Sequence, residues 1–199
     1  MTAELRARLA AALASPGRPS SDFDLNPGTV LPEGRRLREA GVLIGVTGFG
    51  PQPEVILTKR SSRLKHHPGQ IAFPGGKVEE GDASVTEAAM REAEEEIGLP
   101  RRVVEVLGTL PAHETVTGFQ VTPVLGLIAE PFAAVPEVGE VAEVFSVPLD
   151  HLLEPAHYAV EGRRWRGARR QYYTVPWGPY YIWGATARML RALADRLTP

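Results

Sequence analysis

Three glutamates near the middle of the chain, Glu92, Glu95 and Glu96, have the types and the spacing that metal-assisted chemistry needs. In an α-helix, positions i, i+3 and i+4 share one face, so the three carboxylates lie within an arc of about 100°. Like charges this close repel one another, and a hard cation such as Mg²⁺ turns that repulsion into attraction. The alternative interpretation is an ordinary solvated acidic face, which we accept for Glu94 alone.

The segment that carries these carboxylates is predicted to be helical. Residues 83–97 contain neither Gly nor Pro and are rich in Ala, Glu and Met. Asp82 or Ser84 can cap the start, and Gly98 followed by Leu and Pro is a stop signal. The neighbouring stripe of the helix is apolar, so the carboxylates border the buried face. It consists of Ala89, Met90, Ala93 and Ile97.

Two further features support a metal site rather than a plain helix. Arg91 lies four residues after Glu87 and four before Glu95, so we expect it to bridge both and to hold the acidic face in shape. Gly75 and Gly76 precede the helix, and glycines let the backbone approach a ligand closely. The Gly76 carbonyl is therefore a candidate metal ligand.

This stretch resembles the Nudix box, G-x5-E-x7-R-E-U-x-E-E-x-G-U, in which U is an aliphatic residue. Residues 91–99 fit its second half, with Ala93 as a small aliphatic residue. The first half departs, because Asp82 stands in place of the first Glu and eight residues, rather than seven, separate it from Arg91. The departure puts in doubt the role of the family's first Glu and leaves the metal-binding half intact.

The resemblance implies a fold and a reaction. The fold is α/β (α+β), a Nudix fold with a mixed β-sheet sandwiched between helices. The reaction is hydrolysis of a diphosphate with Mg²⁺ or Mn²⁺. The implied metal ligands are the Gly76 carbonyl, Glu92, Glu95 and Glu96. A late acidic loop often supplies another ligand or a general base in this family, and Glu140 is the candidate here; a plain acidic loop is the alternative.

A basic stretch directly upstream points to the substrate. Cations beside a metal site suit a polyanion, because they neutralise and position phosphate groups. Residues 56–76 resemble the second signature of the coenzyme A pyrophosphatase branch, L-L-T-x-R-S/A-x3-R-x3-G-x3-F-P-G-G, with Ile56 for the first Leu and Lys65 for the second Arg. The candidate substrate-binding residues are Lys59, Arg60, Arg63 and Lys65.

The branch implies hydrolysis of coenzyme A or its thioesters to 3′,5′-ADP and 4′-phosphopantetheine, or its acyl form. One alternative is a Nudix hydrolase of ADP-ribose or another nucleoside diphosphate derivative. An alternative from a different class is a non-catalytic Nudix-fold nucleotide-binding module. Proteins of that class usually lose box carboxylates, and Glu92, Glu95 and Glu96 are all present here.

Composition sets the broad class. A chain of 199 residues, 43% hydrophobic and 23% charged, is typical of one globular domain. We expect an N-terminal helix and connector over residues 1–34 and the Nudix domain, with a C-terminal hairpin and helix, over residues 35–199. A net charge of −2 gives no nucleic-acid footprint, and no apolar run is long enough for a membrane span. The absence of cysteine fits a cytoplasmic protein.

Two weaker candidates lie outside the box. His113 and Glu114 fall in the long connection before Phe119 and could contact substrate, although we favour the alternative that they do not. Five arginines flank a predicted hairpin around Gly167 and could grip a phosphate or adenine. For these we favour an exposed, solvated hairpin. They are Arg163, Arg164, Arg166, Arg169 and Arg170.

Overall fold

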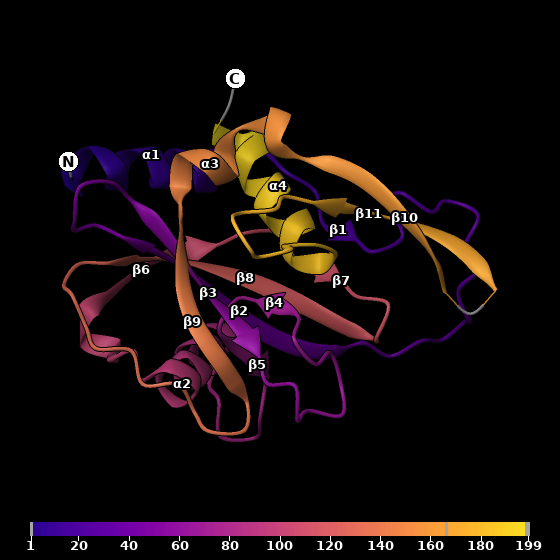
Figure 1. Ribbon diagram of the computed structural model, residues 1–199, viewed down its shortest axis with the longest axis horizontal. Helices are drawn as coiled ribbons and strands as arrows, with labels where there is room; N and C mark the ends of the chain where they lie inside the picture. Colours follow the sequence, from indigo (N-terminus) through magenta and orange to yellow (C-terminus); the bar gives the residue numbers. More distant parts are fainter. Residues whose placement is uncertain (1, 166, 198–199) are drawn as a thin grey trace.

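The computed structural model describes residues 2–165 and 167–197 (Figure 1). The helices are α1 Thr2–Ala14, α2 Val85–Ile97, α3 Leu149–Leu153 and α4 Ala185–Leu197, with short 3-10 turns at Arg101–Val103 and Pro155–His157. The strands are β1 Ser20–Ser21, β2 Arg38–Thr47, β3 Glu54–Arg60, β4 Ile71–Ala72, β5 Gly75–Lys77, β6 Val104–Thr109, β7 His113–Glu114, β8 Phe119–Ile128, β9 Val141–Pro148, β10 Ala159–Trp165 and β11 Ala168–Thr174.

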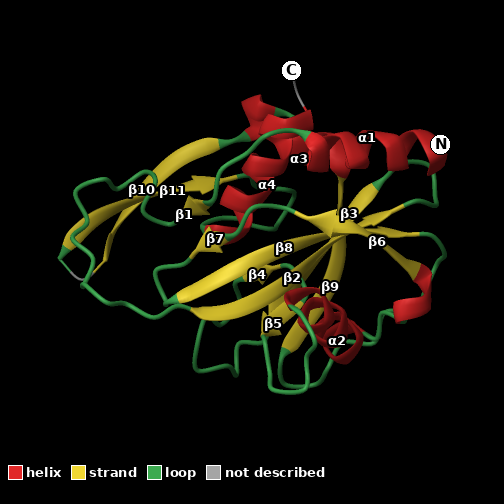
Figure 2. Ribbon diagram, turned by 180° about the vertical axis from the view of Figure 1, so that it is seen from behind, coloured by secondary structure: helices red, strands yellow, loops and turns green. Residues whose placement is uncertain are grey.

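A mixed sheet forms the centre of the molecule. Strand β2 pairs in parallel with β8 and antiparallel with β3 and β5, and β3 also pairs antiparallel with β9. Helix α2 covers one face of this sheet, whereas α1, α3 and α4 cover the other (Figures 1 and 2). The predicted Nudix architecture, a mixed sheet between helices, is confirmed.

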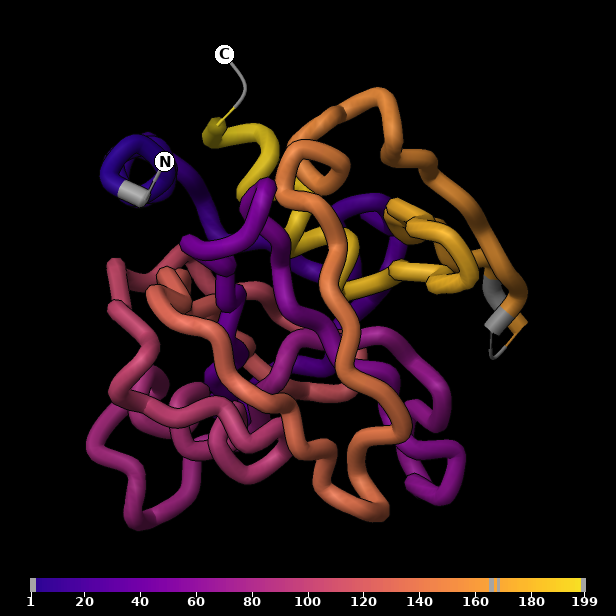
Figure 3. The backbone as a smooth tube through the Cα atoms, turned by 60° about the vertical axis from the view of Figure 1, so that its left-hand side comes forward, coloured from indigo at the N-terminus to yellow at the C-terminus, as the bar shows by residue number. Residues whose placement is uncertain are grey.

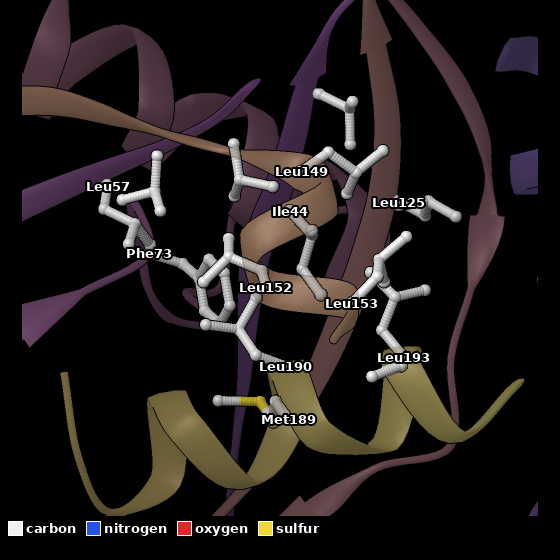
Figure 4. Packing of buried hydrophobic residues seen from close by; sticks show 14 of the residues in the cluster. Ile44, Leu57, Phe73, Leu125, Leu149, Leu152, Leu153, Met189, Leu190 and Leu193 are labelled. Atoms are coloured by element: carbon white, nitrogen blue, oxygen red, sulfur yellow. The ribbon is translucent and has the colours of Figure 1, made fainter. Parts of the chain in front are cut away.

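The larger part of the core lies between the sheet and the layer of α1, α3 and α4. Figure 4 shows the leucines of α3 and of α4 meeting Leu57 of β3, Ile44 of β2 and Leu125 of β8. Helix α1 contributes to the same cluster through Leu5 and Leu9, which are buried. The N-terminal helix therefore packs as part of the hydrophobic core. Strands β10 and β11 form a separate two-stranded hairpin beside it, visible in Figure 3 as the orange and yellow arm.

The helix predicted over residues 83–97 is present as α2, and sequence analysis did not predict three short strands. Strand β5 consists of the glycines and Lys77 that precede α2, and it pairs with β2. Strand β1 lies within the predicted irregular connector and pairs with β7. In β7, His113 is fully buried, and its Nδ1 and Nε2 lie 2.9 Å from Ser20 Oγ and 3.1 Å from Asp22 Oδ1.

His113 therefore ties the N-terminal segment to the sheet. Its neighbour Glu114 pairs with Arg35. Both side chains serve the structure that joins residues 20–35 to β7.

Among the helices of the described residues, none is long and apolar enough to cross a membrane.

Candidate active site

Helix α2 begins and ends as its local signals predict. The Ser84 hydroxyl accepts the N–H of Glu87 at 3.2 Å and caps the first turn, and Gly98 ends the helix in the left-handed conformation. Ala89, Ala93 and Ile97 are fully buried against the sheet. The carboxylate face is thus fixed in rotation, because the apolar stripe beside it cannot leave the core.

Glycines set how closely α2 approaches the sheet. A Cβ atom on Gly41 of β2 would lie 2.1 Å from the Val85 carbonyl oxygen, so only glycine permits this contact. On the neighbouring strand β5, a Cβ on Gly76 would lie 2.3 Å from Glu92 Oε1. Glu92, the first of the three candidate ligands on the helix, therefore lies directly against the Gly76 backbone, where sequence analysis placed a metal ligand.

Glu96 is the most deeply buried member of the acidic face, with a side chain only 5% exposed. Its Oε2 accepts the Gly75 N–H at 3.1 Å, and its Oε1 lies 3.9 Å from Nη1 of Arg60. Burial, with smaller contributions from the negative charges of Glu92 and Glu140, raises the pKa of Glu96 to about 7. The Gly75 N–H and Arg60 oppose this rise but do not cancel it.

The other two carboxylates are progressively more exposed. The Glu92 side chain is 16% exposed and that of Glu95 is 59% exposed. Burial raises the pKa of Glu92, helped by the charges of Glu95 and Glu140 and opposed by Arg91. The acidic face thus runs from solvent at Glu95 to the interior at Glu96. Its buried end is the part that a cation would stabilise most.

Arg91 holds the acidic face together, and of the two bridges that its spacing predicts, the one to Glu95 is present and the one to Glu87 is not. It forms a two-pronged pair with Asp82, Nε to Oδ1 at 2.9 Å and Nη2 to Oδ2 at 3.0 Å, and its Nη1 donates to Glu92 at 3.1 Å and Glu95 at 2.9 Å. The predicted bridge to Glu87 is wrong. Glu87 pairs instead with Arg101 at 2.8 Å, outside the site.

Asp82 also explains the departure in the first half of the box. Its Oδ2 accepts the Glu79 N–H at 2.8 Å while both oxygens hold Arg91. The paired arginine and the backbone N–H, donating to the carboxylate, lower the pKa of Asp82. Its contacts are with the loop and the arginine, so its role here is to shape the turn that leads into α2.

Replacing Arg91 with lysine tests this network. Lysine keeps the charge but cannot form the two-pronged pair with Asp82, so we expect a loss of about 2 kcal/mol in the free energy of unfolding. Urea denaturation provides the measurement. The matched control is Arg101→Lys, whose exposed pairs with Glu87 and Glu94 should contribute no more than about 0.5 kcal/mol. Equal losses in the two variants would contradict a special role for Arg91.

The loop before β9 brings Glu140 to the same end of the helix. The Glu137 N–H donates to the Glu96 carbonyl at 2.9 Å, and the Ser61 N–H donates to the Glu140 carbonyl at 2.8 Å. Glu140 itself is exposed, and its charge contributes to the raised pKa values of Glu92 and Glu96. The loop is therefore fixed to α2 and to the end of β3, an anchoring for which the sequence carries no signal.

The four predicted substrate-binding cations lie in three different places. Arg60 is at the acidic face, beside Glu96. Lys59 is opposite Glu143 of β9, and strand alternation places it on the sheet face away from α2, as for Leu57. The pairing of β3 with β9 also shifts in register between Lys59 and Arg60. Arg63 and Lys65 are exposed on the loop between β3 and β4.

The donors present suit a hard divalent cation. Every candidate ligand is an oxygen, from carboxylates or from the Gly76 carbonyl, as Mg²⁺ and Mn²⁺ prefer. Glu92 lies directly against Gly76, where a Cβ atom would lie 2.3 Å from its Oε1. Within the described ranges, no three acidic or histidine side chains already surround a common point, because Arg91 draws Glu92 and Glu95 toward itself. The residues thus fit a metal that competes with Arg91 for these oxygens.

Comparison with known proteins identifies the family. The NUDIX domain model matches residues 37–166. The chain belongs to the Nudix family. A protein of Enterobacter sp. (strain 638) described as the uncharacterized Nudix hydrolase NudL is 44% identical over 157 residues, which cover 79% of this chain and 81% of that protein. The NudL protein of Shigella boydii serotype 4 (strain Sb227) matches with the same identity and coverage.

Solved structures agree with the fold. The Nudix domain of Shewanella oneidensis NrtR, crystallised with ADP ribose, has a TM-score of 0.53 at 18% identity, covering 86% of this chain and 96% of that one. A MutT/nudix family protein from Enterococcus faecalis has a TM-score of 0.52 at 15% identity, covering 86% and 66%. This Nudix protein is thus a hydrolase of the pyrophosphatase type, in a family that acts on small nucleotide derivatives with divalent metal ions.

Proposed function

We propose that this Nudix hydrolase cleaves the diphosphate bond of coenzyme A or its thioesters, releasing 3′,5′-ADP and 4′-phosphopantetheine or its acyl form. The proposal rests on residues 56–76, which resemble the coenzyme A branch of the family. The observation that supports it most is the 3.9 Å contact between Arg60 of that stretch and buried Glu96 of the box. This contact supports the assignment of the substrate signature and the carboxylates to one site.

The proposed ion is Mg²⁺ or Mn²⁺, and the proposed ligands are Glu92, Glu95, Glu96 and the Gly76 carbonyl. When bound, such an ion lowers the pKa of a coordinated water and stabilises charge on the phosphoryl oxygens. Arg91 keeps Glu92 and Glu95 on one side of the helix, and the ion competes with Arg91 for their oxygens. Glu96 is fixed more firmly, since the Gly75 N–H holds one of its oxygens.

The remaining steps are assigned to protein side chains. Glu92 or Glu140 takes the proton from the attacking water; a carboxylate in that role has to reach the water directly or through one other water molecule. Arg60 neutralises the diphosphate beside Glu96, and the more exposed Arg63 and Lys65 orient the outer phosphate groups. The fourth cation, Lys59, would act from the opposite sheet face, where Glu143 is its cross-strand neighbour.

Product analysis tests the reaction. With coenzyme A, Mn²⁺ and ¹⁸O-labelled water, we expect mass spectrometry to detect 3′,5′-ADP and 4′-phosphopantetheine, with the label on the phosphorus that water attacks. The kcat/KM for coenzyme A should exceed that for ADP-ribose by at least about tenfold, which corresponds to about 1.4 kcal/mol. A higher kcat/KM for ADP-ribose would overturn the substrate assignment and leave the metal site in place.

The organisation of the chain is part of the same proposal. Residues 35–199 are assigned to the hydrolase domain, and residues 1–34 to an N-terminal helix and connector that pack onto it. The cytoplasm is the proposed location, because a chain without cysteine suits a reducing compartment.

A further inference from the structure

The hairpin of β10 and β11 places arginines directly opposite one another. In its register Arg163 faces Arg170, and Arg164 faces Arg169. Cross-strand partners project from the same face, so each pair puts two like charges side by side, which destabilises an antiparallel ribbon. Arg166, predicted to belong with them, lies outside the described residues. An anion bound at either pair would convert this repulsion into attraction.

The two arginines of the first pair lie over different aromatic rings, Arg163 over Trp183 and Arg170 over Phe23 at the longer distance of 5.9 Å. The guanidinium carbon of Arg163 lies 4.4 Å from the centroid of the Trp183 ring, and Tyr172 meets the same indole edge-on at 5.1 Å. Stacking of this kind fixes the guanidinium plane and leaves its N–H edges available to a planar or tetrahedral anion.

The carboxylates of the described residues leave those N–H groups without an ion pair. Among the residues that the structure describes, none of the ion pairs includes Arg163. The nearest acid on its own strand face is Glu161, two residues away, and that carboxylate already accepts the Tyr181 hydroxyl at 2.6 Å. Arg163 is also exposed, so a ligand can reach it.

This cluster lies beside the end of the loop between β3 and β4, whose backbone is hydrogen-bonded to Arg60. A Cβ on Gly184, next to Trp183, would lie 3.9 Å from Nε2 of Gln70, and the Gln70 carbonyl accepts the Arg60 N–H at 2.9 Å. In Figures 1 and 3 the hairpin and the loop between β3 and β4 lie on the same side of the molecule. The turn before Trp183 also reaches β9, because the Tyr180 hydroxyl donates to Glu143.

We propose that Arg163, fixed by Trp183 and assisted by the charge of Arg170, binds the 3′-phosphate of the substrate's adenosine moiety. This inference rests on the proposed function, since coenzyme A carries such a phosphomonoester and ADP-ribose does not. A phosphomonoester bears nearly two negative charges at neutral pH, which two guanidinium groups can balance. The hairpin thereby selects 3′-phosphorylated substrates at a point remote from the bond that is broken.

Binding of nucleotide fragments to the metal-free protein tests the subsite without turnover. The probes are adenosine 3′,5′-bisphosphate and 5′-AMP, measured by titration calorimetry. In Arg163→Gln we expect the Kd for the bisphosphate to rise at least about tenfold and the Kd for 5′-AMP to change less than about twofold. Arg164→Gln is the matched control, because its side chain projects from the other face of the hairpin. It should leave both constants within about twofold. Equal losses in the two variants would overturn the subsite.

Turnover separates the subsite from the reaction. For wild-type protein, kcat/KM for coenzyme A should exceed that for dephospho-coenzyme A, and Arg163→Gln should remove the preference. If wild-type protein cleaves coenzyme A and Arg163→Gln keeps the preference, the subsite is wrong and the proposed function stands. If wild-type protein cleaves neither compound but its affinity for the bisphosphate depends on Arg163, the proposed function is wrong and the subsite stands.

Discussion

Replacing Glu96 with glutamine is expected to remove most of the activity and, in metal-free protein, to increase stability above neutral pH. Loss of one charged group that stabilises a transition state typically lowers kcat by about 100-fold or more. The stability effect has the opposite sign because burial raises the pKa of Glu96 from 4.5 to about 7. Glutamine can still accept the Gly75 N–H, so the hydrogen bond is retained.

The pH dependence follows from this shift. The folded protein holds a proton on Glu96 that the unfolded chain releases near pH 4.5, so wild-type stability falls as the pH rises from there to about 7. The full penalty, on the order of 3 kcal/mol, is present above pH 7 and absent below pH 4.5. Glutamine does not ionise, so the Glu96→Gln variant does not carry this penalty at any pH.

Urea denaturation with EDTA at pH 5 and pH 8 measures the difference between wild type and variant. Added Mg²⁺ should reduce the stability difference between wild type and variant at pH 8, because only wild-type protein has the full ligand set. Glu94→Gln is the control, since Glu94 is exposed and paired with Arg101. A Glu96→Gln variant with full activity, or with the same stability gain at both pH values, would refute the proposed site.

Replacing Gly41 with alanine is expected to lower the free energy of unfolding by about 3 kcal/mol or more. The added methyl would lie 2.1 Å from the Val85 carbonyl oxygen, and this backbone atom cannot move without displacing α2 from the sheet. Such a displacement separates Glu92 and Glu96 from Gly75 and Gly76. The folded fraction should therefore also lose activity.

Gly45→Ala is the matched control on the same face of β2. Its methyl would meet the ends of two flexible side chains, Ile128 Cδ1 at 3.0 Å and Leu43 Cδ2 at 3.6 Å, so a cost within about 1 kcal/mol is expected. Urea midpoints of the two variants provide the comparison. Similar losses would mean that the helix adapts to Gly41→Ala and that its distance from the sheet is not critical.

The helical part of the site could be predicted because its signals are local. The cap at Ser84, the stop at Gly98 and the shared face of Glu92, Glu95 and Glu96 all depend on neighbours within about one or two turns. The deep burial of Glu96 could not be predicted from the sequence. Glu96 is enclosed by β5 and by the loop before β9, and both of these segments are distant from it in sequence.

Tertiary contacts also decided the details that sequence analysis missed. Strand β5 was not predicted because Gly-Gly-Lys has low strand propensity, and its pairing with β2 provides the reason for it. Helical spacing assigned Glu87 as one partner of Arg91, but the turn before α2 brings Asp82 into a two-pronged pair with Arg91 instead. Lys59 and Arg60 point to opposite faces of the sheet because side chains alternate along a strand, and the packing of α2 on one face decides that Arg60 is the one beside Glu96.

The parallel pairing of β2 with β8 has a consequence for how the protein is made. Arg38 pairs with Phe119 and Thr47 with Ile128, so partners in the middle of the sheet are 81 residues apart. Closing so long a loop must precede the gain from pairing, which favours folding in milliseconds to seconds rather than microseconds. During synthesis, the apolar faces of β2 stay without this partner until residues 119–128 have emerged. That interval is when the nascent chain is most prone to aggregate and most in need of a chaperone.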